Sequence, residues 1–423
     1  MASNDQPRWT QLLKMIPFCH EHRHLYIWGT HQAQRYLEKY LNMSGISIEG
    51  YMKTDSYGSM LPWWWQNQEN CDCNDGDRDY HFNEIIEKYR DDNAFGILVA
   101  EEDMYLNDIV VQISSSGLSF DQVYFLSEYN KRAIAYKMTL RPVDRMWIEV
   151  NLADHCNLNC QMCDHFSPVA KPHFLEFAEY TRDIKRLAEL TGGKMGIMKL
   201  QGGEPLLNEN IIDFIKVTRE TFPDCIIFLF TAGLLLKQWE KHPKGNLWQA
   251  CHDYDVRIQF TIYPIGIDVA GIKYLAKKYG VMLDAFSEVG DRTFQGVKRS
   301  CKHPFRLEGD VEKWQFISCY QFNESITLKG GKLYTCPMIP YIDSFNDYFN
   351  QSLSVSENDY IDIYKANTYE ELAEFMTRRT DFCGYCDVVS RRHFDWKQSE
   401  HTIDEYVDAE GEWKRFLCDK NEG

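Results

Sequence analysis

The sequence lacks the features that direct a chain into or across a membrane. Its start, MASNDQPRWTQLLKMIPFCHEHRH, has no basic segment, long apolar run and small-residue cleavage site of the kind that make up a signal peptide. No stretch approaches the roughly 18 apolar residues of a membrane-spanning helix. The longest apolar-rich run, residues 225–236, is shorter and contains Gly and Thr. We therefore expect a cytoplasmic protein with no membrane partner.

Positive charge is also in short supply. The 423 residues include 46 Lys and Arg against 63 Asp and Glu, which gives a formal net charge of −17. Broad binding of nucleic acid needs a basic face, so we expect no nucleic-acid partner. Internal repeats and low-complexity tracts are absent as well, and the length predicts two or three domains.

Cysteine, in contrast, is plentiful and unevenly placed. There are 14 cysteines, and they cluster at positions 156/160/163, 319/336 and 383/386. In a reducing cytosol, clustered cysteines form metal or redox sites more often than disulfides. The three clusters are therefore candidate metal ligands.

Residues 22–127 predict an α/β unit with a parallel sheet, because strand and helix patterns alternate. Gly29 opens a turn that only weakly resembles the dinucleotide-binding fingerprint, whose other glycines are missing. The pattern resembles the nucleotide-binding-like domain attached to many sugar-modifying enzymes, and both a ligand-binding and a docking role stay open. Strands are expected at 24–28, 46–52, 95–100 and 123–126, helices at 29–41 and 102–117, and a polar loop at 58–80.

From residue 145 the alternation restarts and gives five β/α repeats in succession. This pattern predicts a parallel barrel or part of one, in which chemistry takes place where strands run into their following loops. The cysteines at 156–163 and the sequence GGEP at 202–205 both fall at such strand ends. Strands are expected at 146–152, 195–201, 225–233, 256–264 and 281–286, and helices at 179–190, 210–222, 234–242 and 268–280.

Beyond residue 300 the pattern loosens. The segment SITLKGGKLYTC, residues 325–336, predicts a hairpin within a small cysteine-anchored domain, and residues 344–360 predict an exposed loop. The expected architecture is α/β, with an N-terminal Rossmann-like parallel sheet, a central partial (β/α)6 TIM-type barrel and the small C-terminal domain. The expected boundaries are 1–140, 141–300 and 301–423.

Three cysteines spaced C-x₃-C-x₂-C suit a cubane iron–sulfur cluster with one open iron. Each of the four irons normally takes one thiolate, so Cys156, Cys160 and Cys163 leave one iron unligated. An open position separates a reactive metal site from a closed structural one. The alternative is a zinc site, for which His155, Asp164 or His165 would supply the fourth ligand.

The sequence "CNLNCQMC" after the first barrel strand, with "QGGEPLL" after the second, resembles the radical SAM superfamily. The resemblance implies that the [4Fe–4S] cluster binds S-adenosylmethionine, whose reductive cleavage gives a hydrogen-abstracting 5′-deoxyadenosyl radical. It also implies an electron donor such as flavodoxin or ferredoxin. The implied cofactor-binding residues are Gly202, Gly203, Glu204 and Pro205 at the methionine amino group, Met162 at the adenine, and Thr231 in "FTAG" on the third strand.

The later cysteines resemble the Twitch or SPASM auxiliary-cluster domain. Cys319, Cys336, Cys383 and Cys386 would close the shell of a second [4Fe–4S] cluster, which the resemblance implies to be an electron conduit. A structural zinc ion at the same four thiolates stays open, and Cys301 is an alternative ligand.

The resemblance implies hydrogen abstraction from a small molecule or a peptide. We expect dehydrogenation, epimerisation or deoxygenation of a sugar, aminocyclitol or nucleotide sugar. The alternatives are a maturase that crosslinks or epimerises a ribosomally made peptide, and a non-catalytic iron–sulfur redox sensor. Side chains near the barrel mouth whose roles stay open are Asp164, His165, Ser167, Tyr263, Glu288, Arg292 and the basic run 391–393.

Overall fold

The computed structural model describes residues 10–29, 31–53, 78–101, 106–286, 299–390 and 392–407. The chain divides into two compact units, of which the first holds the residues up to Thr139 together with Glu312–Ser318. The second holds Leu140–Val311 and the residues from Cys319 onward. The segments expected to form the barrel and the cysteine-anchored domain thus lie in one unit, apart from residues 312–318. No helix in the described ranges is long and apolar enough to cross a membrane.

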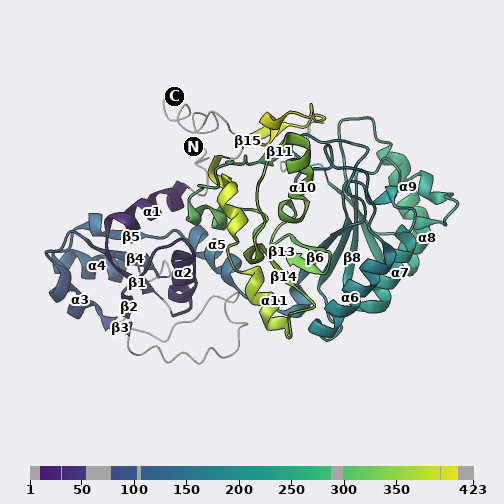
Figure 1. The fold of residues 1–423 in the computed structure, drawn as a ribbon. Coiled ribbons are helices and arrows are strands. Elements are labelled where there is room, and N and C mark those ends of the chain that lie inside the picture. The colour runs from purple at the N-terminus through teal and green to yellow at the C-terminus, as the bar shows by residue number, and fades with distance from the viewer. Residues whose placement is uncertain are drawn as a thin grey trace. The chain divides into compact units, whose positions relative to one another are not determined.

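The first unit contains a five-stranded sheet, and its predicted parallel arrangement is confirmed. The strand order is β3-β2-β1-β4-β5 (Figure 1). Successive strands β1 to β3 are added toward one edge of the sheet, and β4 and β5 are added on the other side of β1. The strands are β1 (His24–Gly29), β2 (Gly50–Lys53), β3 (Asp79–His81), β4 (Phe95–Ala100) and β5 (Val123–Phe125). The helices are α1 (Thr10–Glu21), α2 (His31–Met43), α3 (Phe82–Tyr89), α4 (Leu106–Ser116) and α5 (Glu128–Met138).

The second unit is built on an eight-stranded, largely parallel sheet with the order β10-β9-β8-β7-β6-β12-β13-β14. Neighbouring strands from β10 to β12 are parallel, so the hairpin strand β12 supplies a sixth parallel strand next to β6. The strands are β6 (Trp147–Asn151), β7 (Ile197–Gln201), β8 (Ile226–Thr231), β9 (Val256–Thr261), β10 (Leu283–Phe286), β12 (Ile326–Lys329), β13 (Lys332–Tyr334) and β14 (Tyr360–Asp362). A separate antiparallel pair joins β11 (Arg299–Lys302) to β15 (Arg392–Asp395).

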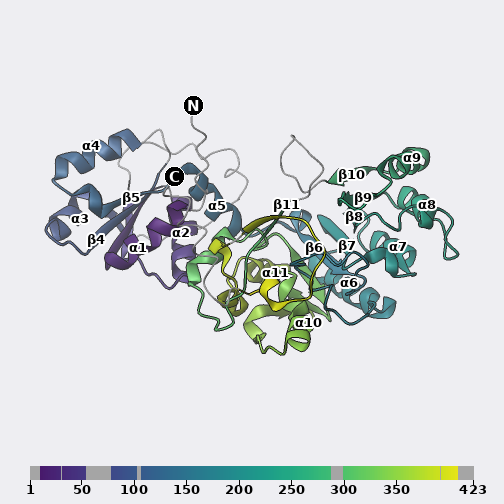
Figure 2. The ribbon, with the colours of Figure 1, turned by 90° about the horizontal axis from the view of Figure 1, so that it is seen from above.

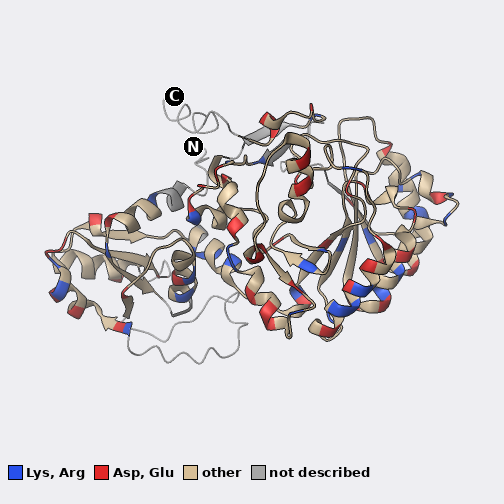
Figure 3. Cartoon of the chain, in the orientation of Figure 1, with Lys and Arg blue, Asp and Glu red and all other residues tan. Residues whose placement is uncertain are grey.

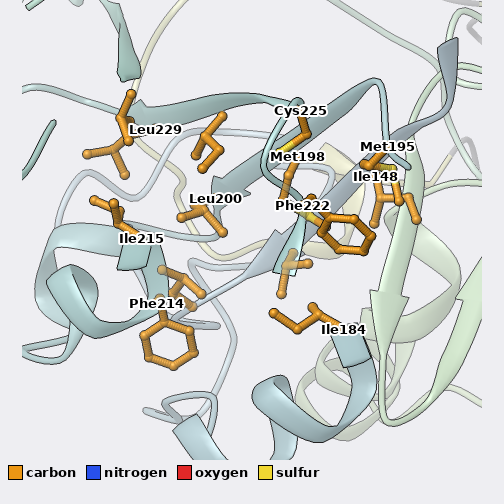
Figure 4. Packing of buried hydrophobic residues seen from close by; sticks show 14 of the residues in the cluster. Ile148, Ile184, Met195, Met198, Leu200, Phe214, Ile215, Phe222, Cys225 and Leu229 are labelled. Atoms are coloured by element: carbon orange, nitrogen blue, oxygen red, sulfur yellow. The ribbon is translucent and has the colours of Figure 1, made fainter. Parts of the chain in front are cut away.

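Helices α6 to α9 follow successive strands and cover one face of this sheet (Figures 1 and 2). Alternate strand residues such as Met198, Leu200 and Leu229 point toward these helices and meet Ile184 and Phe214 (Figure 4). The outer sides of the helices carry charges of both signs (Figure 3). The helices are α6 (Phe177–Thr191), α7 (Ile211–Thr221), α8 (Leu247–Asp253) and α9 (Val269–Tyr279), with α10 (Met338–Phe349) and α11 (Tyr369–Met376) later in the chain.

A second core lies on the opposite face of the hairpin end of the sheet. Leu333 belongs to the core beneath the helices, and the next residue, Tyr334, belongs to the second core. Successive strand residues point to opposite faces, so the two cores are separated by the sheet. The second core joins Phe166 of the first cysteine loop to Cys386 of the last cluster.

Two local predictions are wrong. Residues 234–242 form turns and a short 3₁₀ segment (Gln238–Glu240) instead of a helix, since Leu236 is buried and the Trp239 indole donates to the Leu206 carbonyl at 3.1 Å. Residues 344–349, expected in an exposed loop, finish helix α10. The buried side chains of α10, Met338, Tyr341, Ile342 and Phe345, recur at helical spacing.

Candidate functional site

The three barrel cysteines lie in the loop that leaves the carboxyl end of β6. The loop turns sharply, with left-handed backbone at Asn159, Met162 and Phe166 (φ 54°, 52° and 52°). Non-glycine residues rarely adopt this conformation, which costs energy and therefore needs support from the surroundings. Phe166 supplies such support, because its ring packs in the second core against the ring of Tyr406.

The surroundings of the loop shift the pKa values of its first and third thiols in opposite directions. Burial raises the pKa of Cys156 to about 12, and the charges of Glu204, Cys163 and Cys160 act in the same direction. Burial also opposes ionisation of Cys163, yet the side-chain hydrogen bond and the charge of His165, together with backbone hydrogen bonds from Ser167 and His165, outweigh it and lower the pKa of Cys163 to about 7. Cys160, Cys163 and Glu204 thus all lie within electrostatic range of Cys156.

The GGEP loop after β7 packs directly on the cysteine loop. The amide of Gly203 donates to the carbonyl of Ala153 at 2.8 Å, and the amide of Glu204 donates to the carbonyl of His155 at 3.1 Å. A Cβ atom at residue 203 would lie 2.1 Å from the His155 oxygen. Only glycine permits this approach, so the glycine joins the two loops in addition to any role toward a cofactor.

Glu204 is fully buried and its carboxylate is already engaged by the chain. Its Oε1 atom accepts from the Thr231 hydroxyl at 2.7 Å and the Leu206 amide at 3.1 Å. Its Oε2 atom accepts from the Ala232 amide at 2.9 Å. Burial raises the pKa of Glu204, although these donors act against the shift. The carboxylate thus fixes the β8 loop to the β7 loop.

The remaining predicted cofactor residues lie on the same rim. Gly202 (φ 147°) precedes Gly203, and Pro205 begins a 3₁₀ turn, Pro205–Leu207, that Glu204 caps. Met162 is 6% exposed. The structure therefore brings together the cysteine loop, the GGEP loop and Thr231, all predicted from separate parts of the sequence.

A C-terminal segment that the sequence analysis did not select runs along the cysteine loop. The Gln161 amide donates to the Lys397 carbonyl at 3.0 Å, and the Ser399 amide donates to the Asn159 carbonyl at 2.7 Å. The Gln398 side chain adds a bond to the Leu158 carbonyl at 3.1 Å. No motif marks this segment, so sequence reasoning had no signal for it.

The second set of cysteines also assembles. Burial raises the pKa of Cys336 and of Cys386 well above the ordinary value, and the charges of Cys319 and Cys383 contribute to both shifts. Cys386 is thus within electrostatic range of the other three thiols, although it lies 67 positions after Cys319 in the chain (386 − 319). None of them forms a disulfide.

Among the described residues near the barrel mouth, the buried side chains of Asn151 and Ser167 have no hydrogen-bond partner. Asn151, at the end of β6, leaves both amide atoms unpaired, and Ser167 leaves its hydroxyl unpaired. Such groups are costly in a native interior, and their position suits contact with a bound molecule. Of the other residues left open, Asp164 forms the ion pair described below, His165 lies 3.3 Å from the Gln201 amide, and the Tyr263 ring lies 5.2 Å from Trp396. Glu288, Arg292 and the side chains of Cys301 and residues 391–393 lie outside the described part of the chain.

The donor chemistry of both sets suits iron–sulfur clusters. Within the described ranges no three His, Cys, Asp or Glu side chains are arranged to hold one metal ion. In a cubane each thiolate binds a different iron, so its ligands need not converge on one point as the ligands of a single zinc ion do. Thiols outside any disulfide, one set of three and one of four, match an open and a closed cluster.

Comparison with known proteins supports the first of these sites. Residues 148–261 match the family model described as "4Fe-4S single cluster domain". This segment is therefore similar to a domain that holds one iron–sulfur cluster. It holds the cysteine loop, the GGEP loop and Thr231, and it ends at the last residue of β9.

The curated relatives match about a quarter of this chain. The "GTP 3',8-cyclase" of Sulfurovum sp. (strain NBC37-1) is 35% identical over 101 residues, 23% of this chain and 29% of that protein. The protein of the same name from Staphylococcus epidermidis (strain ATCC 35984) is 34% identical over 110 residues, 24% of this chain and 30% of that protein. The chain thus spans less than a third of these relatives.

Solved structures are only distantly similar to this chain. A structure of BtrN in complex with AdoMet and 2-DOIA aligns with a TM-score of 0.37 and 18% identity, covering 62% of this chain and 98% of that one. Native anSMEcpe with bound AdoMet aligns with a TM-score of 0.27 and 19% identity, covering 33% of this chain and 43% of that one. Likeness at this level carries no argument about substrate.

Proposed function

We propose that the chain is a radical SAM enzyme that modifies a small molecule. The observation that carries the proposal is the contact between two loops at the carboxyl ends of neighbouring parallel strands. One loop holds Cys156, Cys160 and Cys163, and the other, GGEP, packs on it through Gly203. When bound at these thiols, a [4Fe–4S] cluster with S-adenosylmethionine supplies a 5′-deoxyadenosyl radical that abstracts hydrogen from a C–H bond.

The residues of the chain prepare this site in four ways. The thiols of Cys156, Cys160 and Cys163 would hold three irons. Gly202 and Gly203 allow the backbone to approach a methionine amino group closely, and Glu204 fixes the loops around it. Asn151 and Ser167 offer buried polar atoms at the rim. Gln398 and its neighbours cover the cysteine loop, which favours exclusion of water from the site.

The first test is S-adenosylmethionine cleavage by anaerobically reconstituted protein. We expect a [4Fe–4S] absorbance and electron paramagnetic resonance signal, and release of 5′-deoxyadenosine on reduction. Cys160→Ala should abolish both the barrel-cluster signal and the release. Cys251→Ala is a matched control, because this buried core cysteine lies in α8 away from both sets. Protein that binds zinc alone, with no iron-dependent signal, would refute the proposal.

We further propose that Cys319, Cys336, Cys383 and Cys386 hold a second, closed [4Fe–4S] cluster. Four protein ligands leave no iron open to substrate, so such a cluster would accept an electron from a substrate radical. Cys383→Ala should halve the iron content while some 5′-deoxyadenosine release persists. Equal loss of barrel-cluster iron in Cys383→Ala and Cys160→Ala would count against separate roles, and stoichiometric zinc in the wild type would assign a structural ion.

The substrate we propose is a sugar, an aminocyclitol or a nucleotide sugar, which is dehydrogenated, epimerised or deoxygenated. The resemblance of the first unit to domains of sugar-modifying enzymes supports it, and so does a second cluster suited to oxidation. The relatives are named for GTP chemistry, and among these candidates a nucleotide sugar is the most similar to GTP. Mass spectrometry of reactions with each class would decide: turnover of a peptide alone would favour the maturase alternative.

A further inference from the structure

A largely buried ion pair lies directly after the third barrel cysteine. Asp164 follows Cys163 in the chain, and its Oδ2 atom lies 2.5 Å from the Nζ atom of Lys302 on β11. The side chain of Asp164 is 15% exposed and that of Lys302 is 21% exposed. Solvent screens such a pair much less than an ion pair on the surface, so its charges act over a longer range.

The same carboxylate oxygen also accepts hydrogen bonds from the two residues that follow Cys319, the first cysteine of the second set. Oδ2 of Asp164 accepts from the Tyr320 hydroxyl at 2.9 Å and from the Gln321 amide at 2.9 Å. Tyr320 immediately follows Cys319. The hydrogen bond between Asp164 and Tyr320 therefore connects the neighbour of Cys163 to the neighbour of Cys319.

The packing around Asp164 keeps the two sets together. Phe166, two residues further on, places its ring 6.0 Å from that of Phe305 and 5.7 Å from that of Phe345. The core that these rings form also contains Cys386, and Cys319 packs against it. Among the charges that act on the Cys386 thiol, that of Asp164 follows those of the other three cysteines of the set.

We propose that Asp164 and Lys302 are positioning residues that set the reduction potentials of the two clusters through their opposite charges. The inference rests on the proposed function, because it requires iron at both sets. Reduction adds an electron to a cluster, so a nearby carboxylate disfavours it and a nearby ammonium favours it. In the intact pair the two charges oppose each other, so each limits the shift that the other causes, while Tyr320 and Gln321 hold the carboxylate in place.

The test is a redox titration of the reconstituted full-length protein, followed by electron paramagnetic resonance. Asp164→Asn should raise the midpoint potentials of both clusters, Lys302→Met should lower them, and the double variant should return close to the wild type. Lys278→Met serves as the control: it breaks an ion pair with Glu240 (2.6 Å) on the helical side of the sheet and should leave both potentials unchanged.

Opposite shifts at full iron content separate this role from a purely structural one, which would not move the potentials in opposite directions. Unchanged potentials in both single variants, or shifts of the same sign, would overturn the proposal. Loss of iron in both single variants, with or without recovery in the double variant, would assign the pair a purely structural role and overturn the proposal. Failure of the proposed function would instead appear in the wild type, as missing cluster signals.

Discussion

At the scale of single residues, Glu204 decides how the cofactor loop is built. Its carboxylate accepts from Thr231, Leu206 and Ala232 while fully buried. Glu204→Ala would leave these donors without an acceptor, so we expect the free energy of unfolding of the apoprotein to fall by about 2–4 kcal/mol. Urea denaturation of the metal-free protein measures this directly.

The conservative control is Thr231→Ser, which keeps the hydroxyl and should change the stability by well under about 1 kcal/mol. If Glu204→Ala unfolds like the wild type yet fails to bind S-adenosylmethionine, the carboxylate acts on the cofactor and not on the loops. That result would contradict the structural role derived from its hydrogen bonds.

Glu49 makes the first unit sensitive to acid. Partial burial raises the pKa of Glu49, but hydrogen bonds from His24, Tyr89 and Tyr26 outweigh it and leave the pKa lowered. The Tyr89 and Tyr26 hydroxyls lie 2.7 and 2.9 Å from its Oε2 atom. A lowered folded-state pKa means that the stabilisation is complete above the unfolded-state pKa, about 4.3, and is lost as the pH falls through the folded-state value.

We therefore expect Glu49→Gln to destabilise the first unit at pH 7 and to match the wild type in strong acid. The difference at pH 7 should be about 1 kcal/mol, because the side chain is 34% exposed and solvent weakens its interactions. Urea unfolding of both proteins along a pH series measures it. A difference that widens on acidification would contradict the assignment.

At the scale of elements, the hairpin of β12 and β13 connects the barrel sheet to Cys336. Its two turn residues, Gly330 and Gly331, have φ angles of 59° and 69°, as a tight hairpin turn requires. Asn tolerates this conformation at either position. A Cβ at Gly331 would lie 2.6 Å from the Tyr364 ring, whereas a Cβ at Gly330 meets no atom within 4 Å.

We therefore expect Gly330→Asn to be nearly neutral and Gly331→Asn to lower the unfolding free energy by about 1–3 kcal/mol through overpacking. Thermal unfolding of the two variants provides the comparison. Tyr364→Ala should reduce the cost of Gly331→Asn, because it removes the clashing ring. Equal effects of the two asparagines would show that the backbone, and not the ring, limits this turn.

The elements that sequence reasoning identified are those with strong periodicity. Strands such as 95–100 and 226–231 and helices such as α7 and α9 follow the expected alternation. The cysteine loop and GGEP fall at strand ends as expected. The helix expected at 234–242 fails because Trp239 is held by a hydrogen bond to Leu206, a residue distant in sequence. The pairing of β12 with β6 was equally invisible, since it joins residues 178 positions apart (327 − 149).

At the scale of the whole molecule, the candidate iron ligands belong to one of the two compact units. All seven candidate cysteine ligands lie in the second unit. Because a group that binds only the folded state stabilises it, removing iron should lower the unfolding temperature of the second unit by several degrees and leave the first unchanged. Differential scanning calorimetry of holo- and apoprotein measures both transitions.

Tyr40→Phe identifies the transition of the first unit. The Tyr40 hydroxyl is buried and donates to the Trp314 carbonyl at 3.0 Å, so its loss should lower only the iron-independent transition. A single transition that moves with iron content would contradict independent unfolding of the units.

The return of residues 312–318 to the first unit has a consequence for how the protein can be divided. Trp314, Phe316 and Ile317 are buried there, far along the chain from the segment they stabilise. Removing residues 1–139 would expose these three apolar side chains to solvent. A fragment that ends at residue 139 would lack them and the packing they provide. Neither fragment is therefore expected to fold independently. Recombination of the chain near residue 140 would destabilise both of the resulting proteins.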